Sequence, residues 1–171
     1  MLFRSIGVSG GSVAEDTSVA QAGLDAYKAG KKIKAASGGE LLDQAMTMVE
    51  AAEKKAVNIK VPMVISVVDM GGNLVLLHRM EDSLLASLEI APNKAYTSVA
   101  LKMPSADVKK LAQEGQELQG IAVQHAGRIV EFGGGLPIYD KNGKQIGAIG
   151  VSGGSVAEDT SVAQAGLNAV K

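Results

Sequence analysis

The sequence contains no cysteine and no tryptophan among its 171 residues, and only two phenylalanines and three tyrosines. The lack of cysteine excludes disulfides, thiolate metal sites and a cysteine nucleophile. Because aromatic residues are scarce, the core has to be built from Val, Ile, Leu, Ala and Met. The length is sufficient for one domain with a substantial core.

An excess of charge of one sign is also missing, since the net charge is −1. The basic run Lys28–Lys34 lacks the aromatic residues and arginines of a nucleic-acid patch, so we interpret it as a solvated linker and expect no nucleic-acid partner.

No apolar stretch approaches the roughly 18 residues of a membrane span. Gly7–Gly11 interrupts any signal-peptide core. We expect a cytoplasmic protein without a membrane partner.

Several catalytic motifs are absent, among them G-x-G-x-x-G, G-x-x-x-x-G-K-[ST] and H-E-x-x-H. The two histidines lie 47 positions apart, which does not suggest a histidine-rich metal site. The acidic residues Asp69, Glu81 and Asp82 form no convincing catalytic pair. The sequence gives poor support for an ordinary hydrolase, and we predict no catalytic residue.

The chain carries a duplicated end. Ile6–Leu24 is identical to Ile149–Leu167, displaced by 143 positions. Because this offset has the size of a small domain, it predicts one domain plus an extra copy of its C-terminal segment. We therefore divide the chain into residues 1–39, a duplicated segment with a linker, and a domain at 40–171.

Two copies compete for one place in the fold. Ile149–Val151 continues the strand of a predicted Asn142-Gly143 hairpin, whereas Ile6–Val8 would have to close a loop of more than about 100 residues to reach the same partner. The second copy should occupy the sheet, and the first should form a separate helix.

Periodicity, capping boxes and turn residues predict an α+β fold with a five-stranded antiparallel sheet of the meander type and flanking helices. We expect the main part of the third helix to begin near Ala91, because Pro92 favours a first turn. The predicted helices are Ser12–Lys28, Glu40–Val57, Leu84–Lys102 and Ser105–Glu114, and the predicted strands are Met63–Asp69, Asn73–Arg79, Gly127–Phe132, Leu136–Asp140 and Lys144–Val151.

A cleft for an acidic ligand is the first site hypothesis. Lys94 lies among apolar helix residues, where a lysine either binds an acidic group or extends to the surface. Phe132–Pro137 contains three consecutive glycines that allow either close approach to a ligand or a bulge. Gly153–Ser155 leads from a strand into a capped helix, which is either an anion site or a plain turn. The candidate ligand-binding residues are Arg79, Lys94, Phe132, Gly133, Gly134, Gly135, Pro137, Gly153, Gly154 and Ser155.

Four segments of the chain are distinctive: VVDMGGNLVLLHRMED at Val67–Asp82, APNKAYTS at Ala91–Ser98, GRIVEFGGGLPI at Gly127–Ile138 and IGAIGVSGG at Ile146–Gly154. Together they resemble the GlcG/HbpS/PduO-C-terminal-like family, whose members are often described as haem-binding or haem-degrading. The resemblance covers residues 40–171. It implies a profilin- or PAS-like fold, homo-oligomers from dimer to octamer, a small-molecule or haem ligand, and a metabolic setting that includes microcompartments.

The resemblance also bears on haem. His78 and His125 are each able to ligate haem iron or to serve as hydrogen-bonded structural histidines. The first core helix, Glu40–Val57, lacks the histidine that some relatives have, and His125 stands where many have Asn.

Three functions remain open. The first is a binding protein for haem or a small acidic metabolite, with Lys94 and free N–H groups neutralising a carboxylate. The second is a haem-degrading or other cofactor-assisted enzyme. The third is an oligomeric structural component of a metabolic assembly.

Overall fold

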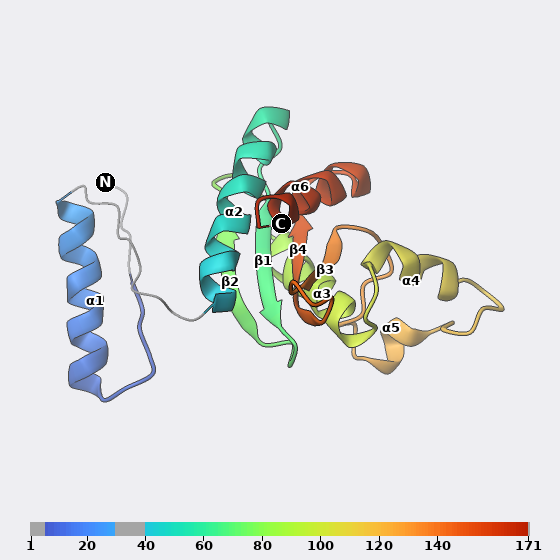
Figure 1. Ribbon diagram of the computed structural model, residues 1–171, viewed down its shortest axis with the longest axis horizontal. Helices are drawn as coiled ribbons and strands as arrows, with labels where there is room; N and C mark the ends of the chain where they lie inside the picture. The colour runs from blue at the N-terminus through green and yellow to red at the C-terminus, as the bar shows by residue number, and fades with distance from the viewer. Residues whose placement is uncertain (1–5, 30–39, 171) are drawn as a thin grey trace. The chain divides into compact units, whose positions relative to one another are not determined.

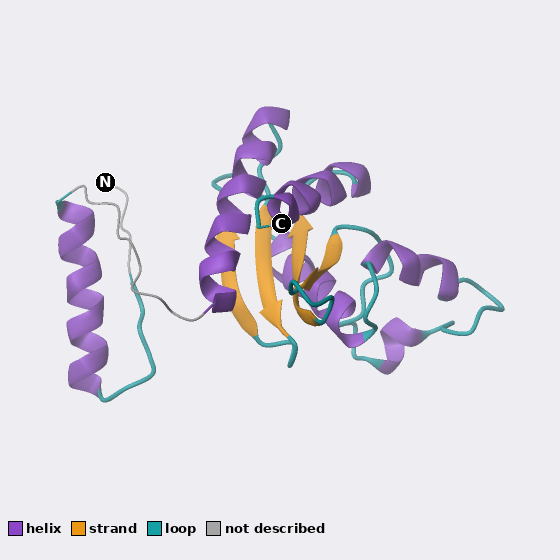
Figure 2. Ribbon diagram, viewed as in Figure 1, coloured by secondary structure: helices purple, strands orange, loops and turns teal. Residues whose placement is uncertain are grey.

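The computed structural model describes residues 6–29 and 40–170, and its contacts divide the chain into two compact units, residues 1–36 and 37–171. The first unit contains helix α1 (Val13–Lys28) and the segment that leads into it. The second unit contains the remaining helices and a sheet, which are coloured by element type in Figure 2.

Within its described residues, 40–170, the second unit has four strands rather than the five predicted. The helices are α2 (Glu40–Ile59), α3 (Ser87–Ala100), α4 (Ser105–Leu111), α5 (Ile121–Gln124) and α6 (Val156–Asn168), and the strands are β1 (Val64–Asp69), β2 (Leu74–Arg79), β3 (Gly135–Tyr139) and β4 (Gln145–Ser152) (Figure 1). All pairings are antiparallel, in the order β2-β1-β4-β3. Two hairpins are therefore joined through β1 and β4, which is not a simple meander.

The predicted strand Gly127–Phe132 is wrong. Gly127 lies three residues after the end of the short helix α5 and has a φ of +78°. The N–H of Val130 donates to Thr97 Oγ1 at 2.8 Å. The segment is thus attached to a side chain of α3, and its backbone donor is not available for a sheet ladder.

Helix α3 also differs from the prediction, because it begins at Ser87 and contains Pro92 in its interior. Ser87 is buried and its hydroxyl lies 3.0 Å from Ser152 Oγ. This contact with β4 fixes the helix start before the proline, so the missing N–H of Pro92 falls inside the helix.

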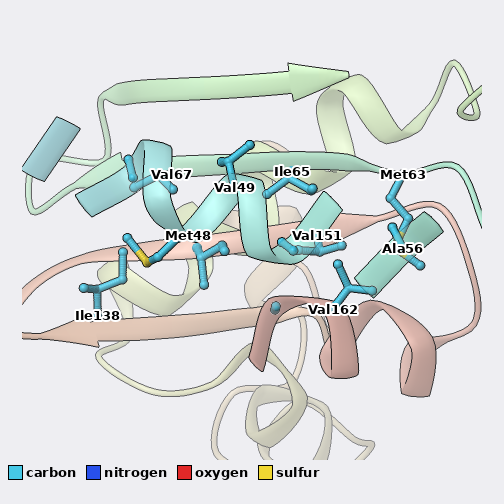
Figure 3. Close-up of a cluster of buried hydrophobic side chains, with 13 residues drawn as sticks. Met48, Val49, Ala56, Met63, Ile65, Val67, Ile138, Val151 and Val162 are labelled. Carbon is cyan, nitrogen blue, oxygen red and sulfur yellow. The ribbon is translucent and has the colours of Figure 1, made fainter. Parts of the chain in front are cut away.

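Helices cover both faces of the sheet. Ile65 and Val67 of β1 pack with α2 and α6 in the main core (Figure 3), and Val68 packs with Ala95 and Val99 of α3 on the other face. Because β1 is buried on both sides, four of its first five residues are apolar and they do not alternate with polar ones; Ser66 is the exception and is buried as well.

Of the two copies of the duplicated segment, the second supplies the strand in the sheet, as predicted. Ile149–Val151 lies in β4 and pairs with β1 and β3, whereas Ile6–Ser9 has no strand assignment. No helix in the described part of the chain is long and apolar enough to cross a membrane.

Candidate functional site

A buried ion pair lies where α3, α6 and the Phe132–Pro137 segment meet. We call this segment, with its three consecutive glycines, the glycine loop. Lys94 is fully buried, and its Nζ donates to Asp159 Oδ2 at 2.6 Å and to the carbonyl oxygen of Val151 at 2.9 Å. The ring centroid of Phe132 is 5.0 Å away. Burial lowers the pKa of Lys94, and the Asp159 carboxylate opposes that shift. The lysine charge is thus compensated within the protein.

The start of α6 uses several of its own donors. The second oxygen of Asp159 accepts the Gly154 N–H at 2.9 Å. The Ser155 N–H donates to Glu158 Oε2 at 2.8 Å within a complete capping box. The backbone and side-chain hydrogen bonds from Ser155 lower the pKa of Glu158. Internal carboxylates therefore bind these N–H groups, which were predicted to receive a ligand.

The glycine loop closes directly over the ion pair. Gly134 has a φ of +115°, and a Cβ there would lie 2.8 Å from Lys94 Nζ. A Cβ on Gly133 would lie 2.9 Å from Thr160 Oγ1, and the Gly135 N–H donates to Ser105 Oγ at 2.9 Å. The structure therefore brings the predicted loop, lysine and helix start together in close packing. Their role as ligand contacts stays a prediction.

The two ends of the Phe132–Pro137 segment line two different hollows. Pro137 lines a groove of about 570 Å³ beside the edge strand β3 and the end of α6. Phe132 lines a second hollow of about 470 Å³, which also carries the acidic residues Glu89 and Glu131. The lining residues of the β3–α6 groove are Pro104, Leu136, Pro137, Ile138, Tyr139, Asp140, Lys141, Gln164, Leu167 and Val170.

The two histidines lie on opposite faces of the sheet. His78 is opposite Ile65 in the β1–β2 register, and its Nε2 is 3.1 Å from Glu53 Oε1 on α2. His125 follows α5, and its ring is 6.2 Å from that of Tyr96 on α3. One haem cannot be ligated by both histidines of the same chain. Each as a single ligand stays a prediction.

Arg79 ends β2, is exposed and lies opposite Val64. Val64 in turn lies opposite Ser152, the neighbour of Val151, so Arg79 is two strands away from the end of β4 at which Lys94 is bound. Among the described residues, no group of three or more His, Asp or Glu side chains could hold a metal ion.

Two residues near these sites, Asp159 and Tyr139, and one sequence pattern were not predicted. Asp159 shares the helix face of Val162, Ala163 and Gly166 at spacings of three and four, and an acid on an apolar face signals a buried partner. Tyr139, at the end of β3, gave no comparable signal.

The missed pattern is G-x-S-x-G at Gly150–Gly154, which marks some serine nucleophiles. Ser152 is buried, however, and its hydroxyl contacts that of Ser87. His78 pairs with Glu53 and the ring of His125 lies near that of Tyr96, so neither histidine is placed as a hydrogen-bonded base for Ser152 in the described part of the chain. A serine nucleophile is therefore not supported here.

Comparison with known proteins gives consistent matches. The chain is 46% identical over 127 residues to a 15.0 kDa protein from the dhaT-dhaS intergenic region of Citrobacter freundii, covering 74% of this chain and 89% of that one. It is 39% identical over 123 residues to the corrinoid adenosyltransferase PduO of Salmonella typhimurium, covering 72% of this chain but only 36% of PduO.

A solved structure agrees. The crystal structure of the PduOC:heme complex superimposes with a TM-score of 0.72 at 38% identity, over 74% of this chain and 91% of that one. The family model described as "Haem degrading protein HbpS-like" matches residues 41–168. The chain therefore belongs to the HbpS-like family.

Proposed function

We propose that this protein binds haem, or an acidic molecule of similar apolar size, in the β3–α6 groove and acts as an accessory binding protein. The observation that carries the proposal is the lining of the groove. Apolar side chains dominate it, and Tyr139 and Lys141 are placed along the same stretch of chain.

The lining fits the chemistry of haem. The macrocycle is mostly apolar and suits Leu136, Leu167 and Val170. Tyr139 is the residue of the described lining whose type ligates haem iron. Lys141 carries the positive charge that a propionate would attract. Bound haem would supply an iron centre, and the protein would supply the ligand, the apolar walls and the charge.

The relatives support a ligand of this class. A structure 38% identical to this chain is a haem complex, and the family is described as haem-degrading. PduO itself is matched over 36% of its length, so its adenosyltransferase activity is not part of the proposal.

Haemin titration of the purified protein tests the groove. We expect a shifted Soret band that Tyr139→Phe weakens or moves. Tyr27→Phe, which changes an exposed tyrosine of α1, serves as the control and should leave the band unchanged. A band that survives Tyr139→Phe and disappears in His78→Ala or His125→Ala would place haem elsewhere and overturn the groove proposal.

The same sample separates binding from degradation. If the protein only binds haem, the spectrum should persist after addition of a reductant in air. Conversion to a biliverdin-like product would favour the enzymatic alternative. Native mass spectrometry of the protein as purified, before haemin is added, would test the homo-oligomer and report any ligand retained from the cell. A cytoplasmic or microcompartment location also belongs to the proposal, and fractionation of cells would test it.

A further inference from the structure

Helix α1 carries the face with which α6 packs into the domain. In α6 this face consists of Asp159, Val162, Ala163 and Gly166, all of which are buried. The identical residues of α1 are Asp16, Val19, Ala20 and Gly23. No residue of α1 is buried within the part of the chain that the structure describes, and Asp16 and Ala20 line a hollow of about 370 Å³.

The local structure of this face is already formed in α1. The Gly11 N–H donates to Asp16 Oδ1 at 3.0 Å, as the Gly154 N–H donates to Asp159 Oδ1 at 2.9 Å. Both helices begin with a complete capping box. Helix α1 therefore needs little reorganisation to adopt the geometry of α6.

A packing contact is repeated as well. The Cδ1 atom of Ile149 on β4 lies 2.9 Å from the Cβ position of Gly166, and that of Ile6 lies 2.8 Å from the Cβ position of Gly23. Ile6 thus covers on α1 the spot that Ile149 covers on α6. If α1 took the place of α6, Ile149 would contact Gly23 as it now contacts Gly166, and the contact with Ile6 would be replaced by an equivalent one.

The chain is long enough for α1 to reach the place of α6. Helix α6 runs antiparallel to α2, because Gly154 lies beside Val61 after the end of α2 and the Cβ position of Gly166 lies 2.9 Å from the Met48 carbonyl oxygen. From Met48 back to Glu40, α2 extends only about 12 Å. Residues 29–39 connect α1 to Glu40 and span at most roughly 36–40 Å.

We propose that α1 is an alternative occupant of the α6 site in its own chain, with Asp16 replacing Asp159 as the partner of Lys94. Strand β4 stays in place and keeps the Val151 carbonyl on Lys94 Nζ. The same chain is favoured over a second copy, because the tether holds α1 at a high effective concentration. In the structure α6 occupies the site, since a short turn joins it directly to β4.

The test transfers the ion pair from one helix to the other. The protein contains no cysteine, so Val162→Cys and Val19→Cys each introduce a single thiol at the same position of the two copies. Val162 is fully buried and Val19 is 58% exposed. In the otherwise unchanged chain, the thiol introduced on α1 should react with a thiol reagent much faster than the thiol introduced on α6.

Asp159→Asn is then added to each single-cysteine chain. Because α6 now leaves Lys94 without an anion, α1 should enter, so that the α1 thiol reacts about tenfold more slowly and the α6 thiol about tenfold faster. The control Asp16→Asn/Asp159→Asn offers no carboxylate from either helix. Helix α6 then keeps the advantage of its short connection to β4, so the α1 thiol should stay reactive.

Three outcomes would overturn the proposal. The first is an α1 thiol that stays reactive after Asp159→Asn, whether α6 keeps its site or the domain unfolds in a thermal melt. The second is equal protection of the α1 thiol in the control with both carboxylates removed. The third is protection of the α1 thiol that appears only with a doubled mass in light scattering, which would assign α1 to a second copy.

Discussion

At the residue scale, the Lys94–Asp159 ion pair connects helices that cover opposite faces of the sheet. Lys94 belongs to α3 on one face of the sheet, and Asp159 belongs to α6 on the other. The two charges meet beside the last residues of β4, where the Val151 carbonyl oxygen also accepts from Lys94 Nζ. Removal of one partner from a buried pair is costly, because the other charge is left without compensation.

Lys94→Met should therefore lower the free energy of unfolding by roughly 3–5 kcal/mol, measured by urea denaturation. Lys54→Met is the matched control, because Lys54 pairs with Glu50 at the same kind of distance, 2.8 Å, on an exposed helix surface. That change should cost less than about 1 kcal/mol. Helix α1 cannot compensate for Lys94→Met, since the site itself is altered. Equal losses in the two variants would contradict the importance of burial.

The hydrogen bonds of Asp69 should make the stability of the fold depend on pH. The Asn73 backbone N–H and side-chain amide, together with the Gly71 N–H, lower the pKa of Asp69 in the folded protein. The native state therefore binds fewer protons than the unfolded state near and below about pH 4. The stability from this carboxylate is present above the unfolded pKa and is lost as the pH falls through the folded pKa. Asp69→Asn should flatten the acid limb of a stability–pH curve, and an unchanged limb would rule this contribution out.

The sequence indicated only one half of the ion pair. Lys94 was noticed because its helical neighbours are apolar, and the same argument applied to Asp159 would have found its partner. The positions alone could not show that the lysine charge is compensated internally, because that depends on how α3 and α6 meet across the sheet.

At the scale of elements, glycine controls how closely α3 packs on the sheet. A Cβ on Gly150 would overlap the Ala91 carbonyl oxygen and lie 2.6 Å from Ala95 N. Strand β4 therefore needs glycine at this position so that the helix backbone can lie directly against it.

Gly150→Ala should destabilise the domain by about 1–3 kcal/mol through overpacking, as measured by thermal or urea unfolding. The duplicated copy supplies an internal control. Gly7 is the counterpart of Gly150 and has nothing within 4 Å of its Cβ position, so Gly7→Ala should leave stability unchanged. Similar effects of the two changes would contradict close contact with α3 as the cause of the cost.

Elements were predictable where local chemistry specifies them. Asn142-Gly143 turns β3 into β4, and Gly71-Gly72 lies in the turn between β1 and β2. Gly127–Phe132 was misassigned because Ile129 and Val130 are buried, as strand residues would be, although they belong to a loop that is bound to Thr97. The pairing of β1 with β4 depends on long-range contacts that a hairpin signal does not report.

At the scale of the whole molecule, residues 37–171 form a compact unit by themselves. Deletion of residues 1–36 should therefore shift the melting temperature by less than roughly 2–4 °C, the change that about 1 kcal/mol produces at this size. In the shortened chain no second helix is present. Asp159→Asn should thus lower the melting temperature more than it does in the full chain, and equal effects in both chains would contradict exchange of the helices.

The identical stretch Ile6–Leu24 and Ile149–Leu167 also makes the molecule its own reference for measuring burial. The backbone amides of Val19 and Val162 have the same neighbours in sequence and the same helix cap, and they differ in their tertiary surroundings. Because these intrinsic factors cancel, the ratio of their deuterium uptake rates reports what packing into the domain adds to one helix. A single unmodified sample thus yields a quantity that normally requires comparison of a protein with an isolated peptide.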